Sequence, residues 1–183
     1  MSEILADLVL ATYRSAGRLA SPLVDLFLAA RRRAGKEDPA RRGERRGVAS
    51  LPRPDGRLVW VHAASVGETL AVLGLVERLA ATGAGVLVTT GTVTSAEIAA
   101  TRLPAGARHQ YVPVDVGAWV DRFLDHWRPD LAIFVESEIW PATIHALARR
   151  SIPQVLVNAR VSARSARRWR LLDGLPNALF GRL

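Results

Sequence analysis

The chain has 183 residues, 49% of them hydrophobic and 23% charged, which fits one folded domain or one and a fraction and excludes wholesale disorder. The absence of cysteine excludes disulfide frameworks, iron–sulfur clusters and thiol nucleophiles, and the four histidines are scattered, so we expect no metal site. The formal net charge of +8 is almost all arginine, because Lys36 is the only lysine. This charge points to anionic partners: phosphorylated substrates, nucleic acid or an acidic membrane surface.

Residues 1–34 predict an amphipathic helical segment. No apolar run reaches the roughly 18 residues that span a bilayer, and no signal-peptide layout is present. Pro22 is expected to break or kink the helix, and a second apolar stretch then meets Arg31, Arg32 and Arg33. Two interpretations stay open. The segment is a helix packed on its own domain, or it lies in one membrane leaflet with the arginines at the headgroups.

Residues 35–57 are polar, rich in arginine and interrupted by proline, and are predicted to be a connector. A nucleic-acid-binding arm is the alternative for this segment. Acidic residues are interleaved with the arginines and no aromatic residue is present for stacking, so the alternative is disfavoured.

Short apolar segments alternate with helical patterns from residue 58 onward. This alternation predicts an α/β domain, Rossmann-like, with a parallel sheet and helices on both faces. Pro113 suggests that the third strand is an edge strand or an irregular one. The strands are expected at 58–64, 86–90, 111–114, 131–135 and 154–157, and the helices at 68–81, 94–102, 117–127 and 141–150.

Ligands of such sheets bind beyond the carboxyl ends of the strands. The loops expected there carry carboxylates, hydroxyls and arginines, which gather at one edge of the sheet. The candidate site residues, all taken from these loops, are Ser65, Gly67, Glu68, Thr90, Thr92, Glu136, Glu138, Arg160, Ser162 and Arg164.

The loop after the first strand has a structural and a chemical interpretation. Ser65 and Glu68 have the spacing of a helix capping box. A capping box does not explain Gly67, because glycine weakens a helical turn and often marks a close approach to the backbone. Glu68 is therefore also a candidate general base.

The loop after the second strand also has a structural and a ligand-binding interpretation. Thr94 and Glu97 fit a second capping box, which we favour, while Thr90 and Thr92 are potential ligand donors. No phosphate-binding P-loop and no glycine-rich dinucleotide motif is present.

The carboxylates of Glu136 and Glu138 fit either a helix N-terminus or a site in which one of them has a raised pKa. The segment with Arg160, Ser162 and Arg164 is either a solvated face or a site for a phosphorylated or carboxylated ligand.

These segments, in this order, resemble the 3-deoxy-D-manno-octulosonic acid (Kdo) transferases of lipopolysaccharide synthesis. The resemblance covers most of the chain, and Ala142 departs from it where the family often has asparagine. The segments that carry it are 35–37, 44–47, 60–68, 112–115, 136–141 and 158–165.

The resemblance implies a GT-B fold, in which two Rossmann-like domains enclose the active site. The N-terminal domain would receive the acceptor, the lipid A precursor lipid IVA, and the C-terminal domain would bind the donor, CMP-Kdo. It also implies inverting transfer without a metal or other cofactor, and an N-terminal or peripheral attachment to the cytoplasmic face of the bacterial inner membrane. Glu68 would be the general base, and Arg160 and Arg164 would contact the acceptor phosphates or the donor carboxylate.

A two-domain transferase needs roughly twice this length. We therefore expect residues 58–183 to be an incomplete acceptor domain that lacks the donor-binding domain and is inactive alone. Two rival hypotheses remain: a non-catalytic membrane-surface module that binds anionic lipid, and a nucleic-acid-binding domain. The low aromatic content and the carboxylates of the loops argue against the second.

Overall fold

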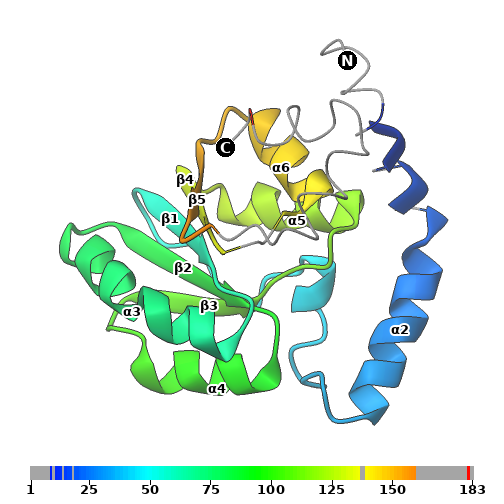
Figure 1. Ribbon diagram of the computed structural model, residues 1–183, viewed down its shortest axis with the longest axis horizontal. Helices are drawn as coiled ribbons and strands as arrows, with labels where there is room; N and C mark the ends of the chain where they lie inside the picture. The colour runs from blue at the N-terminus through cyan, green and yellow to red at the C-terminus, as the bar shows by residue number, and fades with distance from the viewer. Residues whose placement is uncertain are drawn as a thin grey trace.

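The computed structural model describes residues 9, 11–13, 15–17, 19–136, 139–159 and 181. Its centre is one sheet of five parallel strands in the order β3-β2-β1-β4-β5 (Figure 1). The α/β parallel sheet predicted from the sequence is confirmed. The strands are β1 (Leu58–His62), β2 (Gly85–Thr90), β3 (Ala107–Tyr111), β4 (Leu131–Val135) and β5 (Gln154–Val157).

Helices alternate with the strands along the chain, as the sequence pattern predicts. Apart from β3, the strands and the helices that follow them begin and end within two residues of the predicted positions. The helices are α2 (Ser21–Arg33), the short 3-10 turn η1 (Glu44–Arg46), α3 (Val66–Ala81), α4 (Val93–Arg102), α5 (Gly117–Trp127) and α6 (Pro141–Ala148).

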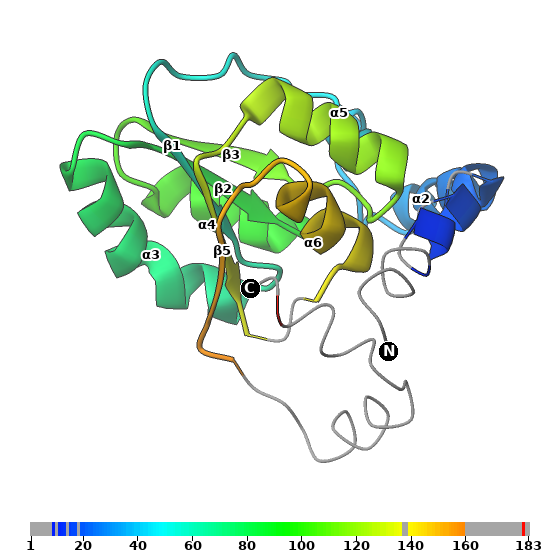
Figure 2. The same cartoon turned by 90° about the horizontal axis from the view of Figure 1, so that it is seen from above.

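Both faces of the sheet are covered (Figure 2). Successive side chains of a strand point to opposite faces, so Val59 and Val61 pack with Val72 of α3, whereas Trp60 packs with α5 and α6. The strands β1, β2, β4 and β5 are therefore apolar at consecutive positions, whereas the edge strand β3 is mostly polar. Because helices cover both faces, these strands are recognised in the sequence by consecutive apolar residues and not by an alternation of apolar and polar residues.

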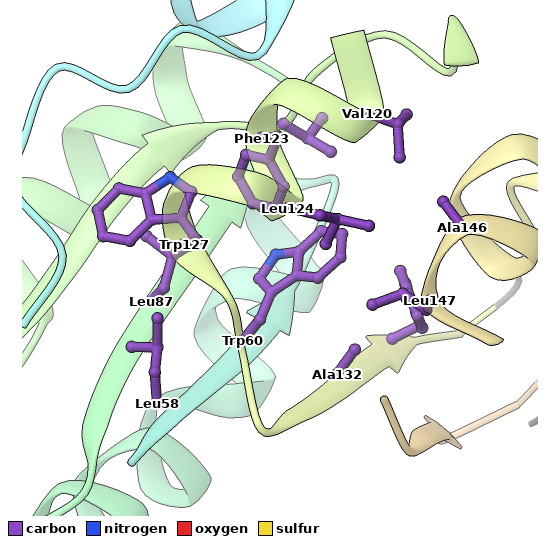
Figure 3. Packing of buried hydrophobic residues seen from close by; sticks show 12 residues of the cluster. Leu58, Trp60, Leu87, Val120, Phe123, Leu124, Trp127, Ala132, Ala146 and Leu147 are labelled. Atoms are coloured by element: carbon purple, nitrogen blue, oxygen red, sulfur yellow. The ribbon is translucent and has the colours of Figure 1, made fainter. Parts of the chain in front are cut away.

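The core under α5 and α6 contains two fully buried tryptophans (Figure 3). Trp60 lies 4.8 Å from Phe123 between ring centroids, and its Nε1 donates to Thr89 Oγ1 at 2.8 Å. The indole Nε1 of Trp127 donates to Gln110 Oε1 at 2.9 Å. Both large side chains are thus buried with their single polar group satisfied.

The third strand begins four residues earlier and ends three residues earlier than predicted. It ends at Tyr111, and only the Val112 amide continues the ladder, by donating to Thr90 O at 2.9 Å. Pro113 has no N–H to continue the pairing. The prediction of residues 111–114 was wrong. β3 is an edge strand, which is one of the two possibilities that Pro113 suggested, although Pro113 itself lies outside the strand.

The N-terminal segment is helical at its described positions between 9 and 19, turns at Ala20, and begins α2 at Ser21. Pro22 lies in the first turn of α2, where a missing amide hydrogen costs nothing. The expected break is therefore confirmed. The helix α2 lies outside the sheet layers and packs through Leu28 on Val116 and Trp119 of the α5 region (Figure 1).

Residues 35–57, predicted to be a connector, are held against the end of β3 by Glu44. This side chain is only 1% exposed. Its carboxylate accepts from the Arg41 guanidinium, the Ser50 hydroxyl and the Tyr111 amide, the last at 2.7 Å. A buried carboxylate is tolerated here because its oxygens have several donors.

Gly47 ends η1 in a left-handed conformation with φ of 76°. A Cβ at this position would lie 1.9 Å from the backbone oxygen of Trp119, so the segment approaches α5 more closely than any side chain allows. We expect Gly47→Ala to lower the free energy of unfolding by at least about 3 kcal/mol, since a left-handed alanine alone costs roughly 1–2 kcal/mol. Chemical denaturation measures this change.

The matched control is Gly56→Ala. Gly56 has φ of 73°, but its Cβ would meet nothing within 4 Å, so only the conformational cost of roughly 1–2 kcal/mol is expected. Equal losses for the two variants would contradict the close packing of Gly47 on α5.

Candidate functional site

The loops at the carboxyl edge of the sheet form a continuous rim. Gly91, after β2, donates its amide to Ala64 O after β1 at 3.1 Å. The ring centroids of His62 and Trp140 lie 6.4 Å apart and join β1 to the loop after β4. The order of these contacts follows the order of the strands, as expected for a parallel sheet.

Glu68 is held at the N-terminus of α3 by the predicted capping box. Ser65 Oγ accepts from the Glu68 amide at 3.3 Å and donates to Glu68 Oε1 at 2.7 Å, while the Ala64 amide donates to Oε2 at 2.8 Å. The side chain reaches back to Ala64, one residue before the cap, rather than to Ser65 N. Glu68 is 8% exposed and is fixed in one orientation.

Gly67 faces open space. A Cβ on it would meet nothing within 4 Å, so close packing within the described part of the chain does not require glycine there. The first turn of α3 thus leaves room for a ligand to approach the backbone beside Glu68. The substrate roles of Ser65 and Gly67 remain predictions.

Thr90 is fully buried at the end of β2 and belongs to a polar chain. Arg41, which can only donate, contacts His109 Nδ1 at 3.1 Å. Nδ1 is therefore the acceptor, and Nε2 donates to Thr90 Oγ1 at 3.0 Å. Burial, and then the Arg41 charge, lower the pKa of His109 to about 4. A ligand contact of the Thr90 hydroxyl stays a prediction.

Thr92 caps α4. Its Oγ1 accepts from the Ser95 amide at 3.1 Å and hydrogen-bonds the Ser95 hydroxyl at 2.6 Å. The capping box predicted for Thr94 and Glu97 was wrong, because the extended backbone of Thr92 makes that residue the cap and places Thr94 inside the helix. The predicted ligand contact of Thr92 would need its hydroxyl to form a third hydrogen bond.

Asp115 has a role that sequence reasoning missed. Its buried carboxylate caps α6 from 27 residues away: Oδ2 accepts from the Ala142 amide, and Oδ1 from the amide and hydroxyl of Thr143, at 2.7–2.9 Å. The N-cap residue of α6, Trp140, has no side-chain cap hydrogen bond. Capping motifs are local, so no sequence signal identifies a cap this distant.

Tyr13 brings the N-terminal helical segment to the same carboxylate. Its hydroxyl donates to Asp115 Oδ2 at 3.3 Å. Burial, together with the Asp115 charge, raises the pKa of Tyr13 to about 12, and burial also raises the pKa of Asp115 against the lowering effect of its hydrogen bonds. Asp115 therefore links the N-terminal segment to the helix that follows the Glu136 loop.

Glu136 begins that loop in an unusual conformation. Its φ is 61°, which few residues other than glycine and asparagine adopt. Its amide donates to Val157 O at 2.9 Å, and Asn158 Nδ2 donates to its Oε1 at 3.5 Å, so the loops after β4 and β5 are joined. Such strain concentrates at functional sites. The substrate role of Glu136 remains a prediction that this geometry favours.

The remaining candidates, Glu138, Arg160, Ser162 and Arg164, lie outside the described residues. Within the described part of the chain, no group of three or more histidine, aspartate or glutamate side chains is placed to hold a metal ion. The expectation of metal-independent chemistry stays a prediction.

The sheet order and the polar rim define a Rossmann-like α/β domain of the class that binds ligands at its carboxyl edge. Residues 40–183 match the N-terminal-domain family described as 3-deoxy-D-manno-octulosonic-acid transferase (kdotransferase). The chain belongs to this family of glycosyltransferases, as the sequence resemblance indicated.

Two similar proteins are the probable mitochondrial 3-deoxy-D-manno-octulosonic acid transferase of Arabidopsis thaliana and the 3-deoxy-D-manno-octulosonic acid transferase of Rickettsia bellii. The first is 40% identical over 86% of this chain and 36% of its own length, the second 40% over 84% and 37%. The chain thus spans little more than a third of these relatives. Among solved structures, Thermus thermophilus UDP-glucose 4-epimerase, in complex with NAD, matches 67% of this chain and 52% of its own at 14% identity and a TM-score of 0.39.

The lowered pKa of His109 predicts acid sensitivity. An unfolded histidine binds a proton near pH 6.5, whereas the folded one resists protonation down to about pH 4. The contribution of neutral His109 to the free energy of unfolding is thus complete above pH 6.5. It decreases by roughly 2–3 kcal/mol as the pH falls to 4. We expect His109→Gln to flatten this slope in urea unfolding curves measured between pH 4 and 7.

The control is His126→Gln, since His126 is exposed and contacts only Leu51 O at 2.9 Å among the described hydrogen bonds. This variant should keep the wild-type slope. If both variants keep it, His109 is not the group that titrates.

Proposed function

We propose that the protein to which this chain belongs transfers Kdo from CMP-Kdo to the lipid A precursor lipid IVA, with inversion and without a metal, in lipopolysaccharide synthesis. The observation that carries the proposal is the family match over residues 40–183. It includes Glu68, fixed at the carboxyl edge where this fold binds its ligands.

Glu68 is proposed as the general base. In the step that we propose, an acceptor hydroxyl attacks the anomeric carbon of Kdo, its proton moves to Glu68, and CMP leaves with the electron pair of the broken bond. A carboxylate has about four lone-pair sites. The bonds from Ala64 and Ser65 occupy two of them, so Glu68 can be oriented by its own helix and still accept a proton.

The chain would supply the acceptor side of this reaction. The relatives are almost three times as long as their matching region, which supports a second domain for the donor. Glu136 and the predicted contacts at Glu138, Arg160, Ser162 and Arg164 would complete the acceptor site. The chain alone is expected to be inactive.

A membrane surface is the proposed setting, and the cytoplasmic face of the inner membrane is the proposed side. No helix among the described residues is long and apolar enough to cross a bilayer. The outer face of α2, extended by Leu19 two residues before the helix begins, is nonetheless strongly apolar. Its exposed side chains are Leu19, Leu23, Leu26 and Phe27, with exposed fractions of 85%, 71%, 63% and 60%. Three arginines follow at the end of the helix.

The rival hypothesis of a non-catalytic membrane-surface module shares this helix but gives Glu68 no chemical role. The two hypotheses predict different effects of a substitution at Glu68. A purely structural cap would tolerate glutamine, because the amide oxygen still accepts from Ala64 N and the amide nitrogen can donate to Ser65 Oγ.

We expect Glu68→Gln to reduce Kdo transfer by about 10²–10⁴-fold, the usual contribution of a positioned base. Its free energy of unfolding should fall by less than about 1 kcal/mol, because the cap survives. The assay measures Kdo transfer from CMP-Kdo to lipid IVA. It uses the protein at the length that it has in its source cells, and the intact mass of the native protein establishes that length. The 183-residue chain alone serves as the blank.

The matched control is Glu77→Gln, an exposed glutamate on the same helix. It should keep full activity. If Glu68→Gln is as active as Glu77→Gln, Glu68 is not the general base. If the wild-type protein transfers no Kdo, the proposed activity is wrong.

The apolar face of α2 makes a separate prediction. Replacing Leu23 and Leu26 with glutamate should weaken co-sedimentation with anionic phospholipid vesicles by at least tenfold, because each buried leucine contributes roughly 1.5–3 kcal/mol. Leu70→Glu on α3 is the control, since Leu70 is 45% exposed on a different face. Equal binding by all the variants would contradict membrane attachment through α2.

A further inference from the structure

A cavity lies between α2 and the η1 segment, outside the edge strand β3. Its volume is about 220 Å³, many times the roughly 10–15 Å³ that one water molecule needs. None of its lining residues belongs to the proposed transfer site. The charged residues that line it are Asp25, Arg32, Glu37, Arg42, Arg45 and Arg46, and Leu28 and Ala29 of α2 complete the wall.

Four arginines face two carboxylates in this cavity, which leaves it a formal charge of +2. Arg46 pairs with Asp25 at 2.7 Å, and Arg45 Nε lies 3.3 Å from Glu37 Oε2. Glu37 is shared, because Arg31 also pairs with it. The two carboxylates therefore neutralise only part of the positive charge around them.

Two of the arginines are available to a ligand. Arg32 and Arg42 are exposed, and neither forms an ion pair within the described part of the chain. They come from different elements, one from α2 and one from the segment before η1, so they approach the cavity from two sides.

Arg45 adds a buried donor to the cavity wall. Its Nε is buried and forms no well-aligned hydrogen bond among the described atoms, although Glu37 Oε2 lies 3.3 Å away and Nη1 donates to Val112 O at 2.6 Å. Burial lowers the pKa of Arg45, which indicates that its charge is poorly solvated. An anion in the cavity would give this guanidinium a second negative partner beside Glu37, which it shares with Arg31.

We propose that the cavity between α2 and η1 binds a phosphate monoester. Such a group carries close to two negative charges at neutral pH, which matches the charge of the cavity. Its several oxygens can accept from guanidinium groups on more than one side, and arginine is suited to this geometry. The monoester can belong to a soluble metabolite or to a lipid headgroup.

The experiment titrates the 183-residue chain with inorganic phosphate, glycerol 3-phosphate and dihexanoyl phosphatidic acid below its micelle concentration, by calorimetry at constant ionic strength. Saturable binding at one site per chain is expected. Arg32→Gln and Arg42→Gln should each raise Kd about tenfold, the loss of one charge-assisted contact.

Arg33→Gln is the matched control, because Arg33 neighbours Arg32 on the same helix but does not line the cavity. Its Kd should change less than twofold. Tighter binding of the phosphatidic acid than of glycerol 3-phosphate identifies a lipid source, and equal affinities identify a soluble one. The proposal is overturned if no probe saturates, or if Arg33→Gln weakens binding as much as Arg32→Gln does. None of these outcomes depends on Kdo transfer.

Discussion

The fold depends on one constraint, which is that a sheet of parallel strands must be covered on both faces. The apolar strands satisfy it by sending alternate side chains to α3 and α4 or to α5 and α6. The same arrangement brings every strand-to-helix loop to one edge. The contacts of Gly91 with Ala64, and of Glu136 with Asn158, follow from that geometry and make the loops a single rim.

Two buried carboxylates attach the N-terminal third of the chain to this sheet. Glu44 holds the arginine-rich segment on the end of β3, and Asp115 connects Tyr13 to the first turn of α6. Each is stable in a buried position because several donors surround it. The loss of either carboxylate would leave amides of other elements unsatisfied, so the N-terminal segment is part of the same folded unit as the sheet.

Glu68 is a helix cap and, in the proposed mechanism, would also be the general base. The bonds from Ala64 and Ser65 make it a helix cap, and the same bonds fix the carboxylate at the rim of the proposed acceptor site. A base that is already oriented loses no side-chain entropy when the substrate arrives. The capping box therefore supports the proposed chemistry.

Local signals in the sequence were enough to identify the α/β class, the break at Pro22 and the capping box at Glu68, because apolar runs, proline and capping residues act on their near neighbours in the chain. The family was also readable from ordered motifs. Four features became visible only in the folded structure: the start of β3, the cap at Thr92, the Asp115 link and the arginine-lined cavity. The Asp115 link joins residues far apart in the chain, so its geometry exists only after the sheet has assembled. The cavity is lined by residues 25–46, and it forms only because α2 and the η1 segment fold back beside each other.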